Sequence, residues 1–163
     1  MENQQFLVLR KIKAISDFQF SPITTDVLFD NDDKIKVEYS KNTGRIKHIY
    51  YDENLLLNFR PQNGLFTLSL FAADRIIRSI SIPHLRAVVQ SDISEFIKEG
   101  RNVFCKHITE IDENLRPLDE IIVVNQEDEL LAIGKLILPI PYIKSFTSGV
   151  AIKVRKGINK SKI

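Results

Sequence analysis

The spacing of apolar residues changes early in the chain, and this change constrains the fold more than any other feature of the sequence. Between residues 6 and 18 apolar side chains recur at every third position, which is typical of one face of a helix. After Ser21-Pro22 the period becomes two, because apolar side chains alternate with Lys or Glu from Ile35 to Tyr39. This alternation is typical of a strand with one exposed face. The first half therefore needs both an opening helix and a half-buried sheet.

Turn signals divide the rest of the first half into short elements. Ser40–Gly44 is predicted to be a hairpin turn, since its glycine can take a positive φ, and Asp52-Glu53-Asn54 is predicted to be a second turn. The elements expected around these turns are strands over 46–51 and 55–59, a short strand or helix entry over 66–70, and a helix over 72–80. An antiparallel sheet backed by two helices would bury both sets of apolar faces.

A proline between apolar runs, at Ile82-Pro83-His84, marks a predicted boundary between two domains. Beyond it, Asp92-Ile93-Ser94-Glu95 fits a capping box for a short helix. The buried stripe of that helix includes Phe96, and Gly100 is its expected left-handed stop. Short strands are expected over 85–89, 102–108, 120–125, 130–138 and 150–155, with a corner at 139–141.

Several short strands around one short helix predict a small, partly closed barrel. The whole chain is therefore predicted to be an α+β protein, in which the sheet-and-helix domain precedes the barrel. The predicted boundaries are 1–83 for the first domain, 84–157 for the barrel and 158–163 for a flexible basic tail.

Composition agrees with two small folded domains. The chain has 163 residues, of which 44% are apolar and 27% are charged with nearly balanced signs, so buried cores are expected and disorder is not. No apolar stretch approaches the ~20 residues that a membrane span needs, and no secretory signal is visible at the N-terminus. A single cysteine cannot form an internal disulfide, which fits a reducing compartment. We therefore expect a cytoplasmic protein with no membrane partner.

Charge is distributed unevenly along the second half. Residues 108–129 hold eight acidic side chains opposed only by Arg116, whereas residues 130–163 hold seven bases and no acid. An acid-free tract with a basic end can neutralise phosphates and release their counterions. The alternative is that the acidic segment folds beside the basic one and cancels its charge. The pattern of charges leaves both interpretations open.

Candidate catalytic and metal-binding groups are sparse. The glycines are scattered singly, so no glycine-rich loop is present to cradle a phosphate. Cys105 and His107 lie two residues apart and could form half of a zinc site, but the sequence holds no second Cys/His pair. The alternative is a buried thiol beside a packed imidazole on one strand face. No catalytic residue, metal or cofactor is therefore predicted.

Five segments of the second half follow one another in the order found in a known RNA-binding module. They are Asn102–Lys106, Arg116–Glu120, Val123–Asn125, Asp128–Lys135 and Ser148–Arg155. By these segments the second half resembles the PUA domain, which is named for pseudouridine synthases and archaeosine transglycosylases. Leu118 stands at a turn position that is usually glycine in this family, and it should reshape that turn.

Three segments of the first half carry a second resemblance: Asp17–Phe20, Thr43–Ile46 and Arg60–Ser69. They are similar to the small domain that precedes PUA in archaeal tRNA-guanine transglycosylase and in the related archaeosine synthase. Those enzymes also carry a large catalytic barrel, which a chain of this length is too short to contain. The resemblance therefore implies an archaeal accessory half without the catalytic domain. Its implied partners are RNA, expected to be tRNA, and a tRNA-modifying enzyme subunit.

The junction between the short helix and the next strand is the leading candidate for an RNA contact. A helix end followed by a strand start would present backbone amides together with Arg101, and in PUA domains the equivalent glycine-containing turn meets RNA. Lys153 and Arg155 lie two residues apart on a predicted strand, so they should share a face. The predicted RNA-binding residues are Gly100, Arg101, Asn102, Val103, Lys106, Lys135, Lys153 and Arg155.

Each of these features also has a purely structural interpretation. Gly100 could be a simple helix stop beside a solvated arginine, and the basic strand pair could be an ordinary sheet exterior. The leading functional hypothesis is a non-catalytic protein that docks tRNA through phosphates and shape for a tRNA-modifying enzyme. The alternatives are a protein-interaction scaffold or general RNA adaptor, which a large apolar surface patch would favour, and a small enzyme, which would need a pocket with convergent ionisable groups.

Overall fold

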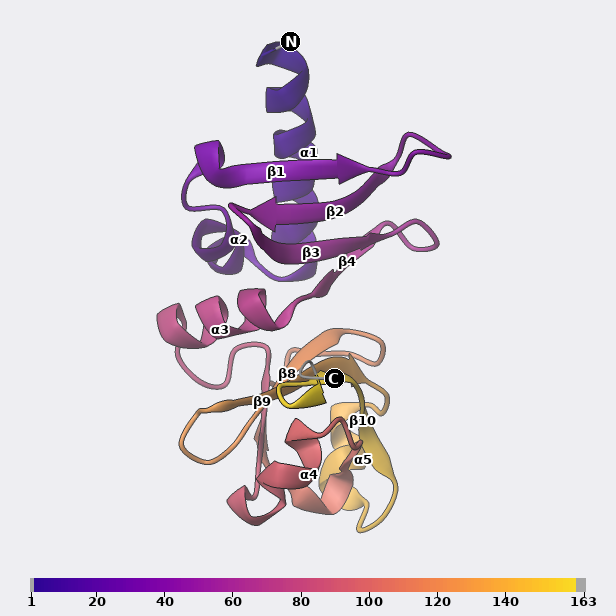
Figure 1. Cartoon of the computed structure of the whole chain (residues 1–163). Helices are drawn as coiled ribbons and strands as arrows, with labels where there is room; N and C mark the ends of the chain where they lie inside the picture. Colours follow the sequence, from indigo (N-terminus) through magenta and orange to yellow (C-terminus); the bar gives the residue numbers. More distant parts are fainter. Residues whose placement is uncertain (1, 161–163) are drawn as a thin grey trace. The chain divides into compact units, whose positions relative to one another are not determined.

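The computed structural model describes residues 2–160 (Figure 1). The chain forms two compact units, Met1–Ile80 and Ser81–Ile163. Each unit has its own sheet and its own buried core, and each is described by itself.

The first unit is built on a four-stranded antiparallel sheet. Its strands lie in the order of the sequence, and each pairs in antiparallel fashion with the next. The strands are β1 (Ile35–Tyr39), β2 (Ile46–Tyr51), β3 (Asn54–Arg60) and β4 (Leu65–Leu68). The helices are α1 (Glu2–Gln19), α2 (Pro22–Leu28) and α3 (Leu70–Ser79), and a short 3₁₀ turn, η1 (Asp32–Lys34), precedes β1. The predicted opening helix and alternating strands are confirmed.

Helix α2 departs from the prediction, which placed a change to strand directly after Ser21-Pro22 and expected two helices in this unit. The Ser21 hydroxyl accepts a hydrogen bond from the amide of Thr24 at 3.3 Å and so caps the helix. Pro22 stands in the first turn, where its missing N–H costs nothing. A helix of seven residues is too short for its apolar spacing to be recognised in the sequence.

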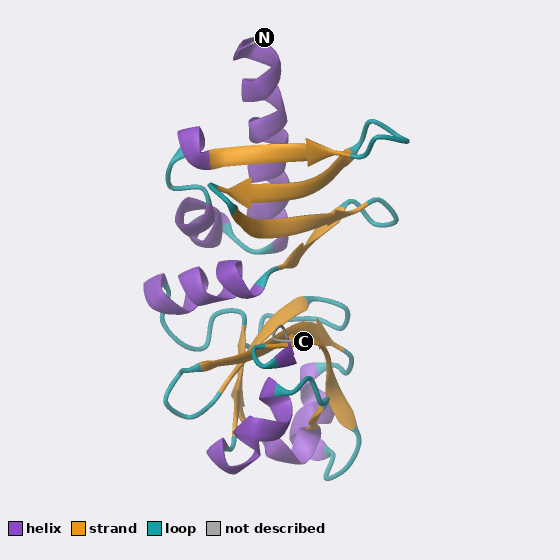
Figure 2. Ribbon diagram, viewed as in Figure 1, coloured by secondary structure: helices purple, strands orange, loops and turns teal. Residues whose placement is uncertain are grey.

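The core of the first unit lies between the sheet and its helices. Helix α1 lies behind the sheet in Figure 2, and Ile12 on this helix is fully buried. Ile49 and Leu57 are paired across β2 and β3 and are also fully buried. The predicted apolar stripe of α1 is only partly covered, because Phe6 and Phe18 expose 65% and 85% of their surface.

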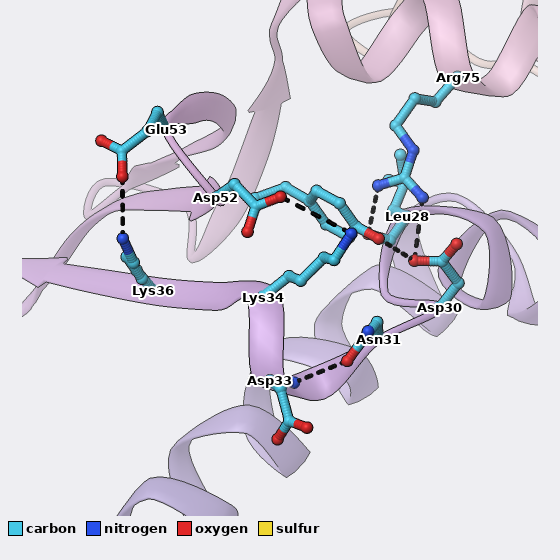
Figure 3. Close-up of polar contacts among 10 residues, drawn as sticks. Leu28, Asp30, Asn31, Asp33, Lys34, Lys36, Asp52, Glu53 and Arg75 are labelled. Atoms are coloured by element: carbon cyan, nitrogen blue, oxygen red, sulfur yellow. Dashed lines mark hydrogen bonds and ion pairs between the residues drawn. The ribbon is translucent and has the colours of Figure 1, made fainter.

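Arg75 of α3 ties the end of α2 to the sheet (Figure 3). Its guanidinium donates hydrogen bonds to the carbonyls of Val27 at 2.8 Å and Leu28 at 3.2 Å, which are left without partners by the end of the helix. The same group lies 3.1 Å from Asp30 and 4.0 Å from the centre of the Tyr51 ring. A hydrogen bond from the Tyr51 hydroxyl is the main cause that lowers the pKa of Asp30. One planar cation therefore joins three elements.

Replacing Arg75 with lysine should destabilise the first unit although the charge is kept. Lysine has no planar fork, so it cannot serve both carbonyls and stack on the ring together. We expect a loss of about 2 kcal/mol in the free energy of unfolding, measured by urea denaturation followed by circular dichroism. Arg78→Lys is the matched control, because Arg78 makes only an exposed ion pair with Asp74. Equal stability of the two variants would contradict this account of Arg75.

The second unit is a nearly closed six-stranded barrel with short helices. Its strand order is β6-β10-β9-β8-β5-β7, with a parallel pairing between β5 and β8 and antiparallel pairings elsewhere. The strands are β5 (Arg86–Val89), β6 (Val103–Phe104), β7 (Ile108–Ile111), β8 (Glu120–Val124), β9 (Leu130–Leu136) and β10 (Val150–Gly157). The short helices are η2 (Ser91–Ile93), α4 (Ser94–Lys98), η3 (Cys105–His107) and α5 (Ile140–Ser145). The predicted partly closed barrel and the α+β class are confirmed.

The helix before Gly100 differs from its prediction in two respects. Ile93 stands at the cap position of α4 and no side chain caps the helix, so the predicted capping box does not form. Phe96, placed in the predicted buried stripe, exposes 54% of its surface, whereas Ile97 is buried. A helix of five residues presents only one turn to the barrel, so a single apolar side chain fills the contact.

Two other segments are helical where strands or a corner are predicted. Residues 105–107 form η3, so Cys105 and His107 do not share the face of a strand. Pro139 stands at the start of α5 rather than at a simple corner, because a proline is well tolerated at the entry to a helix. Leu118 takes a φ of 77°, which favours glycine, and its side chain is exposed.

Strand β10 ends at Gly157, directly before the residues of the predicted tail. The amides of Ile158 and Asn159 donate to the carbonyls of Leu131 at 3.0 Å and Lys98 at 2.9 Å. Residues 161–163, which include Lys162, lie outside the described residues. No helix in the described part of the chain is long and apolar enough to cross a membrane.

Candidate nucleic-acid interface

The turn after α4 ends the helix at the predicted glycine. Gly100 has a φ of 99°, and the amides of Gly100 and Arg101 donate to the carbonyls of Ile97 at 2.9 Å and Phe96 at 3.2 Å. This left-handed cap is the expected stop for the helix. Both amides are used by the helix end, so the prediction that this turn offers its backbone amides to a phosphate is wrong for these two groups. A ligand here cannot be bound by these two amides, whereas the side chain of Arg101 is exposed.

The strand pairing of the barrel places this turn beside the basic strand β10. The side-chain oxygen of Asn102 accepts a hydrogen bond from the amide of Val154 at 3.0 Å. The β9–β10 register shifts directly after Val154, so Asn102 satisfies a backbone group at a bulge. The structure therefore brings Gly100–Asn102 together with Lys153–Arg155. Nothing in the local sequence signals this hydrogen bond, because the two residues are 52 positions apart.

Arg101 projects from the turn as an exposed cation. The centre of its guanidinium lies 5.9 Å from the ring centroid of Phe96, which is within the range of a weak cation–π contact. The exposure of Phe96 therefore has a consequence for the site, since its ring supports Arg101 rather than filling the core.

A row of three charged residues crosses strands β8, β9 and β10. Glu120 pairs with Lys135 and Lys135 pairs with Lys153, so the three side chains share one face. Arg155 reaches the same row, because its two terminal nitrogens donate to the Glu120 carboxylate at 3.0 and 2.6 Å. Glu120 is only 4% exposed. Arg155 therefore lies on the side of Lys153, and a carboxylate already balances its charge.

The remaining cations at this surface form no ion pair with a described acidic side chain. Within residues 2–160, Arg101, Lys135 and Lys153 form no ion pair. Lys160 lies over the turn, since a methyl group added at Gly100 would stand 3.1 Å from the Lys160 side chain. Lys160 belongs to the predicted flexible tail, and apolar spacing gives no signal for its contact with this turn. We call Arg101, Lys135, Lys153 and Lys160 the β10 basic surface.

Two of the predicted RNA-binding residues stand apart from the β10 basic surface. Val103 is fully buried in the barrel, so its side chain packs the core. Lys106, on η3, lines a hollow of about 570 Å³ together with Phe146. Lys144, also at this hollow, pairs with Glu113 and thereby lowers the pKa of that carboxyl. This hollow holds acids as well as bases.

The structure offers no metal centre in the part of the chain that it describes. No group of three or more His, Cys, Asp or Glu side chains lies close enough to hold an ion there. Cys105 is a buried free thiol, and burial raises its pKa. A thiol of this kind is a poor nucleophile.

The two units match two described protein families. The patch-forming domain C2 of tRNA-guanine transglycosylase matches residues 10–83. The PUA domain matches residues 86–158. The two families follow one another in the order that the sequence segments indicated.

Relatives of the chain include whole archaeal enzymes. It is 43% identical over 152 residues to the tRNA-guanine(15) transglycosylase of Methanobrevibacter smithii. The aligned region covers 93% of this chain and 23% of the relative. The enzyme of the same name from Thermococcus onnurineus is 38% identical over 149 residues, covering 91% of this chain and 25% of the relative. The chain thus spans about a quarter of the length of the curated relatives it matches, and it corresponds to their non-catalytic C2 and PUA portion.

Solved structures share the fold. A hypothetical protein from Pyrococcus horikoshii has a TM-score of 0.72 at 22% identity, covering 91% of this chain and 88% of that one. A conserved PUA domain protein from Thermoplasma acidophilum has a TM-score of 0.55 at 15% identity, covering 68% of each chain. At these identities the likeness concerns the fold alone.

The pair between Glu120 and Arg155 should act as a structural unit. We expect Glu120→Gln to lower the free energy of unfolding by about 2 kcal/mol, because a guanidinium that is largely covered loses its charged acceptor. Arg155→Gln should have a similar effect, and the double variant should lose clearly less than the sum of the two. Urea denaturation measures all three. The control is Lys153→Gln, because Lys153 forms no ion pair with a described carboxylate. If the losses of unfolding free energy in the two single variants simply add in the double variant, or if Lys153→Gln loses as much as they do, the pair does not stabilise the barrel.

Proposed function

This chain is a PUA-domain protein that corresponds to the non-catalytic accessory part of tRNA-guanine(15) transglycosylases, and on that premise we propose that it binds tRNA. The contact is made by the β10 basic surface, which holds the phosphate backbone through side chains. The proposed domain organisation keeps the sequence-based boundaries, with a C2-like domain over 1–83 and the PUA domain over 84–157. We propose the cytoplasm as the compartment in which it binds tRNA, as expected from the sequence.

The observation that carries the proposal is the direct pairing of Lys135 with Lys153 across β9 and β10. Like charges placed opposite one another on neighbouring strands destabilise a sheet. No described carboxylate forms an ion pair with either lysine. A phosphate bound between them would relieve the repulsion and release its counterions. Arg101 lies next to β10, because the side chain of the following residue, Asn102, accepts a hydrogen bond from the amide of Val154.

The biochemical role follows from the type of relative. Relatives named tRNA-guanine(15) transglycosylase contain the C2 and PUA portion within a longer chain. We propose that the present chain serves a catalytic domain of that class by holding tRNA in place, with the PUA unit on the acceptor end. Most protein contacts to a nucleic-acid backbone fix register and orientation without reading sequence. An accessory role of this kind needs no catalytic group on the chain itself.

A protein-binding role is the second candidate, and one surface feature favours it. Tyr142 on α5 and Phe146, which directly follows this helix, stack on each other with ring centroids 5.4 Å apart, and both rings are about half exposed. Exposed aromatic side chains beside a hollow are common anchors at protein interfaces. This surface is distinct from the β10 basic surface in its residues, so the two candidates can be separated by mutation.

Removing two unpaired cations should weaken RNA binding in a salt-dependent way. We expect Arg101→Gln combined with Lys153→Gln to lower the affinity for unmodified tRNA. The slope of log affinity against log salt should become shallower by about 1.5, which corresponds to two lost phosphate contacts. Fluorescence anisotropy at several salt concentrations measures both quantities.

The matched control for this experiment is Lys36→Gln combined with Arg78→Gln. It removes the same charge, but both residues already pair with carboxylates, Glu53 and Asp74. The control should bind tRNA as the unmodified protein does. Absence of tRNA binding by the unmodified protein at low salt would overturn the proposed function. An unchanged slope in the Arg101/Lys153 variant would remove the β10 basic surface from it.

A further inference from the structure

Strand β1 is an open edge of the first unit's sheet. Among the described residues it pairs only with β2. An edge strand presents unpaired backbone N–H and C=O groups, to which another strand can bind, and proteins commonly protect it with a proline or a bulge. Residues 35–39 contain no proline. The register shift at the end of the β1–β2 ladder inserts Lys47 of β2 and leaves β1 itself regular. This edge is therefore open to pairing.

The hydrogen bonds at the two ends of β1 show which of its backbone groups face outward. The Lys34 carbonyl accepts from the Asp52 amide at 2.8 Å, and the Ser40 amide donates to the Arg45 carbonyl at 2.8 Å. Successive residues of an antiparallel strand turn their N–H and C=O groups to alternate sides. The even-numbered residues of β1 thus face β2, and residues 35, 37 and 39 face the open edge.

An apolar groove of about 570 Å³ runs between this edge and α1. Leu7 and Val8 line it from the helix, and Val37 and Tyr39 line it from the strand. Leu7 and Tyr39 are each about half exposed. Figure 1 shows α1 crossing behind the sheet and projecting past β1. A strand added at this edge would continue the sheet below the projecting part of the helix and cover these side chains.

The sequence of β1 is complementary to itself. It reads Ile-Lys-Val-Glu-Tyr from residue 35 to residue 39. When two copies run antiparallel and are centred on Val37, Lys36 of each copy lies opposite Glu38 of the other. The apolar residues of the two strands then lie opposite one another on the face of the groove. One strand therefore supplies both the charge pattern and the apolar pattern that the edge accepts.

The outward backbone groups fit the same register. With Val37 opposite itself, its amide in each copy can donate to the Val37 carbonyl of the other, which is the hydrogen-bonded type of antiparallel pair. The Tyr39 amide can donate to the Ile35 carbonyl of the second copy. The Ile35 amide is already bonded to the Asp32 carbonyl, so it is not needed by the new ladder.

The two charged side chains select this register against its neighbours. Lys36 and Glu38 are both exposed, and they hold only exposed contacts within the unit. Lys36 lies 3.1 Å from Glu53 (Figure 3), and Glu38 accepts from the Tyr50 hydroxyl at 3.1 Å. A shift of the pairing by two residues would place Lys36 opposite Lys36 or Glu38 opposite Glu38. Like charges directly opposite one another destabilise a sheet, so only the register centred on Val37 is favourable.

We propose that β1 binds β1 of a second copy of this chain, antiparallel and centred on Val37, so that the two four-stranded sheets become one continuous sheet. The contact is isologous and closes on itself, since the same strand is used on both sides. An edge with a lone lysine repels other strands, whereas here Glu38 of the second copy balances it. The inference concerns the first unit alone and does not depend on RNA binding.

The first test removes the central hydrogen bonds of the dimer. The Val37 amide faces the open edge, so Val37→Pro takes no hydrogen bond from the sheet of one chain, and proline is tolerated on edge strands. We expect its dimer dissociation constant to rise roughly tenfold or more, because both Val37 amides are lost. Sedimentation equilibrium over a range of concentrations measures it. The matched control is Val37→Thr, which keeps the amide and the branched shape, and circular dichroism verifies folding.

The second test exchanges the charges. Lys36→Glu and Glu38→Lys each place like charges opposite one another, so each variant alone should dimerise more weakly than the unmodified protein. Mixed in equal amounts, the two variants should form a heterodimer in which both opposing pairs again have opposite signs. Damage to the single chain cannot produce this recovery. A mixture that associates no better than its two components would overturn the proposed register.

Disulfide trapping reports the register without relying on charge. Cα atoms of a hydrogen-bonded antiparallel pair lie ~5.5 Å apart, which suits a disulfide. Under an added thiol oxidant, Val37→Cys should yield a covalent dimer. Tyr39→Cys should not, since its two copies stand four residues out of register, ~13 Å apart along the strands. The native Cys105 is buried and serves as the background in the unmodified protein.

Two results would overturn the inference as a whole. One is an unmodified protein that stays monomeric up to roughly 1 mM, the range of very weak association. The other is a dimer whose dissociation constant is the same for Val37→Pro and Val37→Thr, because such a dimer uses another surface. A loss of tRNA affinity in Val37→Pro while the unmodified protein is monomeric would assign this edge to RNA instead.

Discussion

The arrangement of the barrel depends on the close passage of β10 between α4 and β9. A methyl group at Gly157 would stand 2.1 Å from the carbonyl oxygen of Lys98, and one at Gly134 would stand 2.3 Å from that of Lys153. No side chain fits at either point, so these two glycines allow the backbones to approach. The approach places the β10 bulge beside Asn102 and the last described residues over the end of α4. The β10 basic surface exists because of this contact.

The structure also sorts the basic residues by what balances them. Arg75 and Arg155 are each engaged by a carboxylate and by packing, so their charge supports the fold. Lys135 and Lys153 face each other across β9 and β10, and neither forms an ion pair with a described carboxylate. A solvated surface ion pair contributes little, but a cluster of like charges has a free-energy cost that an anionic partner can offset. The proposed RNA contact follows from this difference.

Prediction from sequence succeeded where an element is long enough to show its period. The opening helix α1, the four strands of the first sheet and most barrel strands were located from apolar spacing. It failed at α2, η3 and α5, which have seven, three and six residues. These elements are set by a serine cap, by the edge of the barrel and by a proline at the helix start, and one or two turns do not build a recognisable apolar stripe.

The sequence by itself determined the order of two domains, the alternation of the strands, the helix stop at Gly100 and the resemblance to the C2 and PUA families. Only the tertiary structure decided which candidate groups are free to bind a ligand. Glu120 and Arg155 are 35 positions apart, and the amides after α4 are taken by carbonyls of that helix. Charge balance depends on distances of a few ångströms between strands. Strand register sets those distances, and apolar periodicity along one segment does not encode its register with another.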